Sequence, residues 1–152
     1  MGLSIALARE IVGELSAVTS LNINIMDAGG RIIASRDPAR IGSYHEGADR
    51  IIKQGLEELI ITEGAPLAGT RPGLNYPIIM RGRSVGVLGI TGRYGDIVDS
   101  ARIIKRMTEL YLQNVYATEQ KQFGASVRNR YIDELVNGDV KSITGEFVAR
   151  GR

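Results

Sequence analysis

Apolar residues recur along the chain with two different periods, which predict where its helices and strands lie. A helix is predicted from Ser4, a favourable N-cap residue, because apolar side chains then recur with a helical period through residue 15. Residues 21–26, LNINIM, alternate instead, and the turn sequence DAGG leads into a second apolar run at residues 31–35. This pattern predicts a β-hairpin. A second hairpin is predicted in LNYPIIMRGRSVGVLGITG, turning at Arg81, Gly82 and Arg83.

Helical patterns return between the two hairpins and after them. Residues 43–60, SYHEGADRIIKQGLEELI, predict a second helix, with Gly55 as a possible break. A long helix is predicted from Asp96 onward, with Gly124 as a weak point and an end near Gly138. Pro77 cannot donate to a β-ladder, so its strand is expected either to lie at a sheet edge or to start after this residue.

The order helix, hairpin, helix, hairpin, long helix predicts one α+β domain with an antiparallel sheet. It suits PAS-like sensor folds, in which helices cross a small sheet and leave a ligand pocket between. We expect residues 1–137 to form one domain that includes the long helix. Residues 138–152 are expected to be a linker or tail.

Composition narrows the classes of function. The chain has no cysteine and one histidine, which argues against disulfides and against metal sites built from cysteine or histidine. Its net charge of +2 is not gathered into a basic cluster interleaved with aromatic residues, so the charge is a weak signal for nucleic acid. The N-terminus lacks the charge pattern of a signal peptide and reaches Arg9 and Glu10 too soon for a membrane span. We therefore expect a cytoplasmic protein with no metal and no cofactor.

The single histidine, His45, lies in the stretch that carries the strongest candidate site. Ser43 and Glu46 have the spacing of a capping box, which predicts Ser43 as N-cap of the second helix and places His45 in its first turn. Free N–H groups at such a position favour anions, and Arg40 can add a bidentate fork for a carboxylate. The alternatives are a common helix cap, an Arg40 ion pair with Asp37 or Glu46, and a histidine bonded to a backbone carbonyl.

The second hairpin supplies further candidates. Asn75 could bond its own loop or reach a ligand hydroxyl, and a ligand could approach Thr91 and Gly92. Asn22 and Asn24 could line a polar pocket or face solvent. No metal motif or nucleophile elbow appears, and a catalytic serine would have only His45 as its partner, so enzymatic activity is not expected. The candidate ligand-binding residues are Arg40, Ile41, Gly42, Ser43, His45, Asn75, Thr91 and Gly92.

Three stretches taken together resemble a known family. NINIMDAGGRIIASRDPARIGSYHEGA, PGLNYPIIMRGRSVGVLGITG and the preceding AREIV are similar to the sensor domain of carbohydrate diacid regulators, which are bacterial transcription factors. The similarity runs from about Ala8 to Glu134. It implies that residues 1–137 are a cytoplasmic effector-recognition domain that binds a small hydroxy-acid such as glucarate, galactarate or glycerate. In such regulators a helix-turn-helix module follows; no such pattern occurs before Arg152, so we expect a sensor fragment that binds DNA only through a module missing from this chain.

The resemblance and the residues together give a specific hypothesis. Arg40, the amides of residues 42–45 and the His45 ring are expected to hold a carboxylate, while Asn75, Thr91 and Gly92 receive hydroxyls or the distal acid. The long helix is expected to carry the signal and to support a homodimer, although its first half could simply cover the sheet. Two alternatives stay open: a PAS-like pocket in which His45 ligates haem, and an enzyme that acts on the hydroxy-acid.

Overall fold

The computed structural model describes residues 2–136 of the 152-residue chain, and for residues 119–136 it describes the backbone alone. The chain divides into two units, Met1–Leu110 and Tyr111–Arg152. The sheet and every predicted site residue belong to the first unit. The predicted tail at residues 138–152, and the predicted helix end at Gly138, lie outside the described residues.

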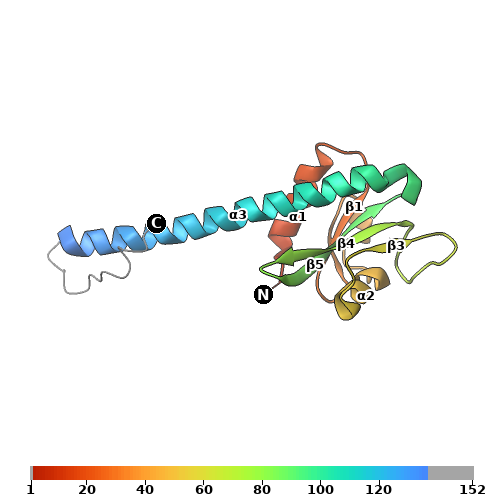
Figure 1. The fold of residues 1–152 in the computed structure, drawn as a ribbon, viewed down its shortest axis with the longest axis horizontal. Helices are drawn as coiled ribbons and strands as arrows, with labels where there is room; N and C mark the ends of the chain where they lie inside the picture. The colour runs from red at the N-terminus through yellow and green to blue at the C-terminus, as the bar shows by residue number, and fades with distance from the viewer. Residues whose placement is uncertain (1, 137–152) are drawn as a thin grey trace. The chain divides into compact units, whose positions relative to one another are not determined.

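The described residues form three α-helices, one short 3-10 helix and five strands (Figure 1). The sheet order is β2-β1-β5-β4-β3, and every neighbouring pair is antiparallel. This architecture confirms the predicted α+β class with an antiparallel sheet and a long C-terminal helix. In chain order the elements are α1 (Ile5–Ser16), β1 (Ile23–Met26), β2 (Ile32–Ser35), η1 (Pro38–Arg40), α2 (Glu46–Gln54), β3 (Leu59–Ile61), β4 (Gly73–Met80), β5 (Arg83–Thr91) and α3 (Tyr94–Val136).

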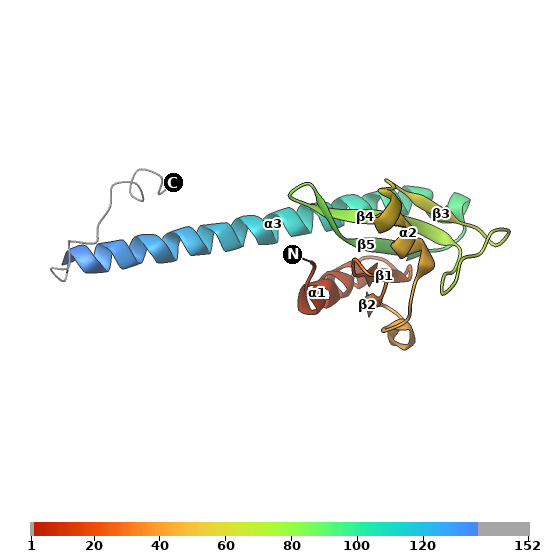
Figure 2. The same ribbon diagram turned by 90° about the horizontal axis from the view of Figure 1, so that it is seen from below.

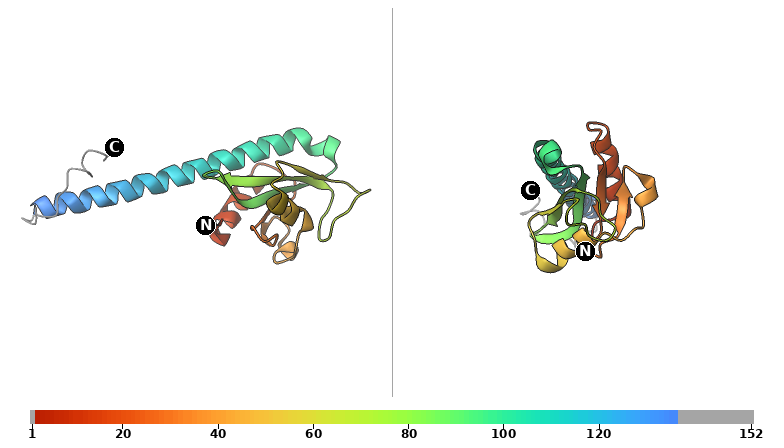
Figure 3. Two further views of the ribbon diagram at one scale, coloured as in Figure 1. Left: turned by 60° about the horizontal axis from the view of Figure 1, so that its bottom comes forward. Right: turned by 90° about the vertical axis from the view of Figure 1, so that its right-hand side faces the viewer.

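Helices cover both faces of the sheet. Helix α1 packs along β1 and β2 (Figure 2), and the start of α3 lies on the same face, where Lys105 stands over the ring of Tyr76 on β4. Helix α2 covers the opposite face (Figure 3). Side chains alternate between the two faces of a strand, so every second residue of β1, β4 and β5 points toward α2.

An apolar cluster fixes α2 on its face of the sheet. Ala48 and Ile51 of α2 pack against Met26 of β1, Ile32 of β2 and Val87 of β5, and all five are essentially inaccessible to solvent. Full burial of an isoleucine, valine or methionine side chain contributes about 1.5–3 kcal/mol to the free energy of unfolding. The cluster therefore anchors the N-terminus of α2, and His45 just before it, over the central strands.

The structure decides three expectations about the helices and strands. The predicted helix over residues 43–60 ends early, because Gly55 adopts a left-handed conformation as its C-cap, and residues 59–61 form β3 instead. Helix α3 continues through Gly124 without a break. Pro77 lies inside β4, but β3 pairs only with residues 73–75, so β4 does present an open edge at the proline, as expected.

Candidate functional site

Three strands bring polar residues together beneath α2. Asn24 of β1 and Asn75 of β4 both stand opposite Gly89 of the central strand β5, so the three residues form one row across the sheet. A Cβ atom on Gly89 would lie 2.7 Å from Oδ1 of Asn75. The glycine therefore leaves room for two buried amides on the α2 face, each about 3% exposed.

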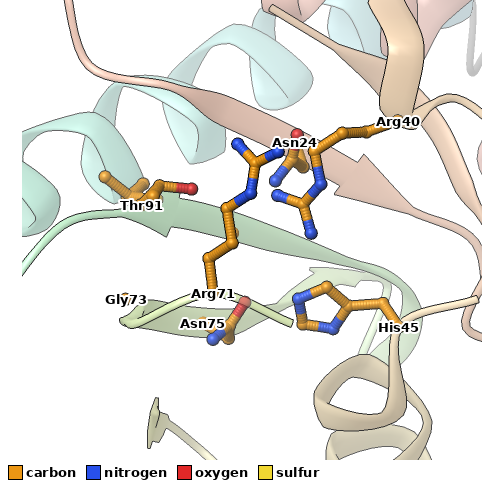
Figure 4. Close-up of a pocket in the computed structure, with 9 residues that line it drawn as sticks. Asn24, Arg40, His45, Arg71, Gly73, Asn75 and Thr91 are labelled. Atoms are coloured by element: carbon orange, nitrogen blue, oxygen red, sulfur yellow. The ribbon is translucent and has the colours of Figure 1, made fainter. Parts of the chain in front are cut away.

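These residues belong to a small pocket, which we call the polar pocket. Among the side chains that the structure describes, no aspartate or glutamate lines it. The space left between the lining side chains is about 10 Å³, room for about one water molecule. Figure 4 shows two guanidinium groups and the imidazole converging on this space. The lining residues are Asn24, Arg40, His45, Arg71, Gly73, Asn75, Gly89, Ile90 and Thr91.

Arg40 is a buried cation that makes hydrogen bonds to neutral groups. It ends η1 and is only 9% exposed, and its Nη2 donates to the carbonyl of Gly69 at 2.9 Å. Its Nη1 lies 2.9 Å from the amide oxygen of Asn24, in the orientation that avoids placing two donors face to face. Burial lowers the pKa of Arg40, the charge of Arg71 lowers it further, and Asp37 raises it. Arginine stays charged despite this, so a bound anion would be strongly favoured here.

His45 is the N-cap of α2, so the predicted capping role of Ser43 is wrong. Its Nδ1 accepts a hydrogen bond from the Ala48 amide at 3.0 Å, which places the proton of the neutral ring on Nε2. Nε2 faces the polar pocket, between Arg40 and Asn75 (Figure 4). Burial, and then the charge of Arg40, lower the pKa of His45 to about 4. The ring is therefore neutral near pH 7 and offers one N–H donor to the pocket.

Three of the four amides in the predicted backbone cradle are already engaged within the domain. The amide of Gly42 donates to Ile32, that of Ser43 donates to Arg40, and that of His45 donates to Gly30. These donors are consumed because the segment folds back along the edge of β2 before α2 begins. Ile41, Gly42 and Ser43 are exposed and do not line the polar pocket. A ligand in this pocket would meet side chains in place of those amides.

The second hairpin contributes some of its predicted residues. Asn75 and Thr91 line the polar pocket, and the Asn75 amide also donates to the Leu59 carbonyl on β3 at 3.4 Å. Gly92 does not line it; a Cβ atom there would lie 2.4 Å from Cγ2 of Ile97. Gly92 therefore lets α3 pack closely at its start.

Sequence reasoning missed Arg71 and left Asn24 undecided. Arg71 ends the loop between β3 and β4, and its Nη2 lies 3.6 Å from Oδ2 of Asp37. Their positions in the sequence could have pointed to both residues. Arg71 comes two residues before the strand that carries Asn75, and Asn24 lies between two isoleucines of a predicted strand. Asp37 pairs with Arg71 and Glu46 with Arg50, so neither of the ion pairs considered for Arg40 is formed.

The loop that carries Arg71 depends on Gly69. This glycine has φ +73°, and a Cβ atom would lie 1.9 Å from the Tyr44 carbonyl oxygen. Gly69→Ala is expected to destabilise the domain by at least about 1 kcal/mol from the left-handed backbone alone, and to displace the carbonyl that accepts from Arg40. Gly64→Ala, in the same loop but with open space around it, is the matched control. Equal unfolding temperatures for the two variants would contradict this role.

The sequence of the chain matches a known protein family. A family model described as "Putative sugar diacid recognition" matches residues 3–135. The chain belongs to this family. The match covers the sheet, the polar pocket and almost all of the described part of α3. The resemblance found in the sequence is thereby confirmed.

Curated relatives come from three bacteria. The chain is 40% identical over 99 residues, 60% of its length, to the carbohydrate diacid regulator of Escherichia coli, of which the match covers 26%. It is 29% identical over 118 residues to the protein YsfB of Bacillus subtilis, covering 77% of this chain and 32% of YsfB. A Haemophilus influenzae protein is 28% identical over 135 residues, covering 86% and 36%. The chain thus spans about a quarter to a third of each relative.

Within residues 2–136, no helix combines the length and the apolar character that crossing a membrane requires.

Proposed function

We propose that this domain is the ligand-sensing part of a transcriptional regulator and that the polar pocket binds a small hydroxy-acid. The observation that carries the proposal is the lining of the pocket: buried Arg40, half-exposed Arg71 and the Nε2–H of His45 converge, and none of the described residues in the lining is acidic. Leaving a cation buried without a charged partner is costly, so a carboxylate is the natural complement. Membership of a sugar diacid recognition family supports this choice.

The lining suggests how such an acid would be held. One carboxylate would accept from the Arg40 guanidinium and from Nε2 of His45, because both donors point into the same space (Figure 4). The amides of Asn24 and Asn75 and the hydroxyl of Thr91 offer both donors and acceptors, which suits the hydroxyl groups of a sugar acid. Glucarate, galactarate and glycerate all carry these two kinds of group.

Neither alternative function gains support from the pocket. A haem needs a large apolar cavity, whereas this lining is polar and cationic, and Nδ1 of His45 is engaged in capping α2. An enzyme acting on the acid would need a catalytic base, and the lining offers only one imidazole, whose pKa is lowered to about 4. The family is described by recognition of a ligand, which favours the sensor.

The remaining parts of the sensor hypothesis concern its architecture and output. The PAS-like arrangement is supported by the pocket between the sheet and the elements that cover its α2 face. The homodimer stays a prediction, supported by Ile103, Met107 and Leu110, which recur at helical spacing on α3 and are 61%, 37% and 48% exposed. DNA would be bound through a further module of the regulator.

Thermal unfolding against a panel of acids tests the proposal. Glycerate, glucarate, galactarate, tartrate and citrate would be compared with neutral sugars at matched ionic strength. A ligand at 100 times its dissociation constant should stabilise the domain by about 2.7 kcal/mol. We expect selective stabilisation by one or more hydroxy-acids. A flat response across the panel, or a Soret band in the purified protein, would contradict the proposal.

A further inference from the structure

Asp37 is the acidic side chain that pairs with a cation of the polar pocket, although it does not line the pocket. Its Oδ1 accepts from the Ala39 amide at 3.2 Å and so caps η1, while its own amide is 3.0 Å from the Ser35 hydroxyl. Its Oδ2 lies 3.6 Å from Nη2 of Arg71. The cap on η1 therefore holds the carboxylate and the Ser35 contact holds the backbone of Asp37, so the arginine is the partner that can move.

The pair between Asp37 and Arg71 is a weak one. Its separation of 3.6 Å exceeds that of a charge-assisted hydrogen bond, and the two side chains are 35% and 46% exposed. Ion pairs of this kind contribute little to stability. Arg71 can therefore turn from Asp37 to another anion at small cost. Because only about 10 Å³ is free between the lining side chains, an acid that enters must also displace part of that lining.

The two arginines differ in how an acid can reach them. Arg40 is buried, its hydrogen bonds are to neutral oxygens, and Asp37 acts on it only through its charge at longer range, so the first carboxylate of a ligand displaces no ion pair there. Arg71 is half-exposed at the end of a loop, and any second carboxylate that it binds must take it from Asp37.

We propose that Asp37 is a specificity-determining residue of the polar pocket. It competes with the second carboxylate of a dicarboxylic ligand for Arg71, and so lowers the affinity for diacids while affecting monoacids much less. This inference rests on the proposed function, because it assumes that an acid binds beside Arg40. Asp37 would then set how much more tightly the pocket binds a dicarboxylic acid than a monocarboxylic acid.

Calorimetric titration with galactarate as dicarboxylate probe and glycerate as monocarboxylate probe tests the inference. Asp37→Asn keeps a side chain that can cap η1 and removes the charge. Loss of the competing ion pair should tighten galactarate binding by about fivefold, the upper range for an exposed pair, and glycerate binding by less than about twofold. Asp99→Asn, an equal charge change at an exposed position on α3, should alter neither affinity.

A second background separates competition for Arg71 from a general charge effect. In Arg71→Gln, the further change Asp37→Asn should leave galactarate affinity unchanged, because the contested partner is gone. If Asp37→Asn does not fold, Asp37→Ser, which can also cap η1, takes its place.

The outcomes separate this inference from the proposed function. Binding of galactarate that Asp37→Asn leaves unchanged or weakens would overturn the inference alone. A gain that persists in the Arg71→Gln background would also overturn it. Failure of the unaltered chain and of all variants to bind either acid would overturn the proposed function as well.

Discussion

Arg40→Ala is expected to weaken hydroxy-acid binding by about 1.5–3 kcal/mol, roughly 10- to 150-fold, the range for a hydrogen bond to a charged group. The buried guanidinium supplies the charge that the acid would neutralise. Among the described residues that line the pocket, no other side chain has both its burial and its permanent charge. Arg40→Lys keeps the charge but loses the planar fork, so its affinity should fall between those of the wild-type and alanine variants. Isothermal calorimetry with the acid selected by the thermal panel measures both changes.

A matched control is available at the opposite end of the sheet. Arg83 is exposed at the start of β5, and Arg83→Ala makes the same change of charge far from the polar pocket. Its affinity for the acid should equal that of the unaltered chain. Because Arg40 also bonds Gly69, each variant's unfolding temperature must be recorded beside its affinity. A folded Arg40→Ala protein with unchanged affinity would remove Arg40 from the binding site.

The second large effect concerns pH and stability. His45 has a pKa of about 4 in the folded domain, against an ordinary value near 6.5. Between these values the unfolded chain binds the proton more readily, so the folded state loses stability as the pH falls from about 6.5 to about 4. The full shift corresponds to a loss of about 3 kcal/mol. Chemical unfolding followed at steps of pH across this window measures the effect.

His45→Asn isolates the contribution of the histidine. Asparagine can accept from the Ala48 amide as an N-cap but does not titrate, so this variant should lose less stability over the same pH window. The comparison is clean because the chain has one histidine, and the carboxylates are common to both proteins. Parallel pH profiles for the two proteins would show that His45 is not held neutral by the fold.

Local patterns predicted most of the fold. The period-two alternation of residues 21–26 and the glycine turns gave both hairpins, and the apolar face of residues 5–15 gave α1. Strand β3 was missed because Leu59, Ile60 and Ile61 are too few to show a period, and the preceding residues are strong helix formers. What ends α2 is the left-handed backbone of Gly55, and pairing with β4 then decides the conformation of the next residues.

The candidate site could be predicted only in part, for a physical reason. Arg40, His45, Asn75 and Thr91 were found because their residue types suit an acid and lie near turns. Arg71 was missed because its place depends on how the loop after β3 folds over α2, where the Glu46 carboxylate accepts from the Ala68 amide at 2.9 Å. The capping box failed because the Glu46 side chain is engaged by this loop, while His45 caps the helix itself.

The most direct test of the central claim uses the single histidine as a probe inside the pocket. The pKa of His45 would be measured by following its ring signals in NMR spectra, with and without saturating galactarate or whichever acid stabilises the domain. The free domain should show a pKa of about 4, and a carboxylate placed against Nε2 should raise it, because a nearby negative charge favours the protonated ring. An acid that stabilises the domain while leaving the His45 signals and their pKa unchanged would place its binding site elsewhere.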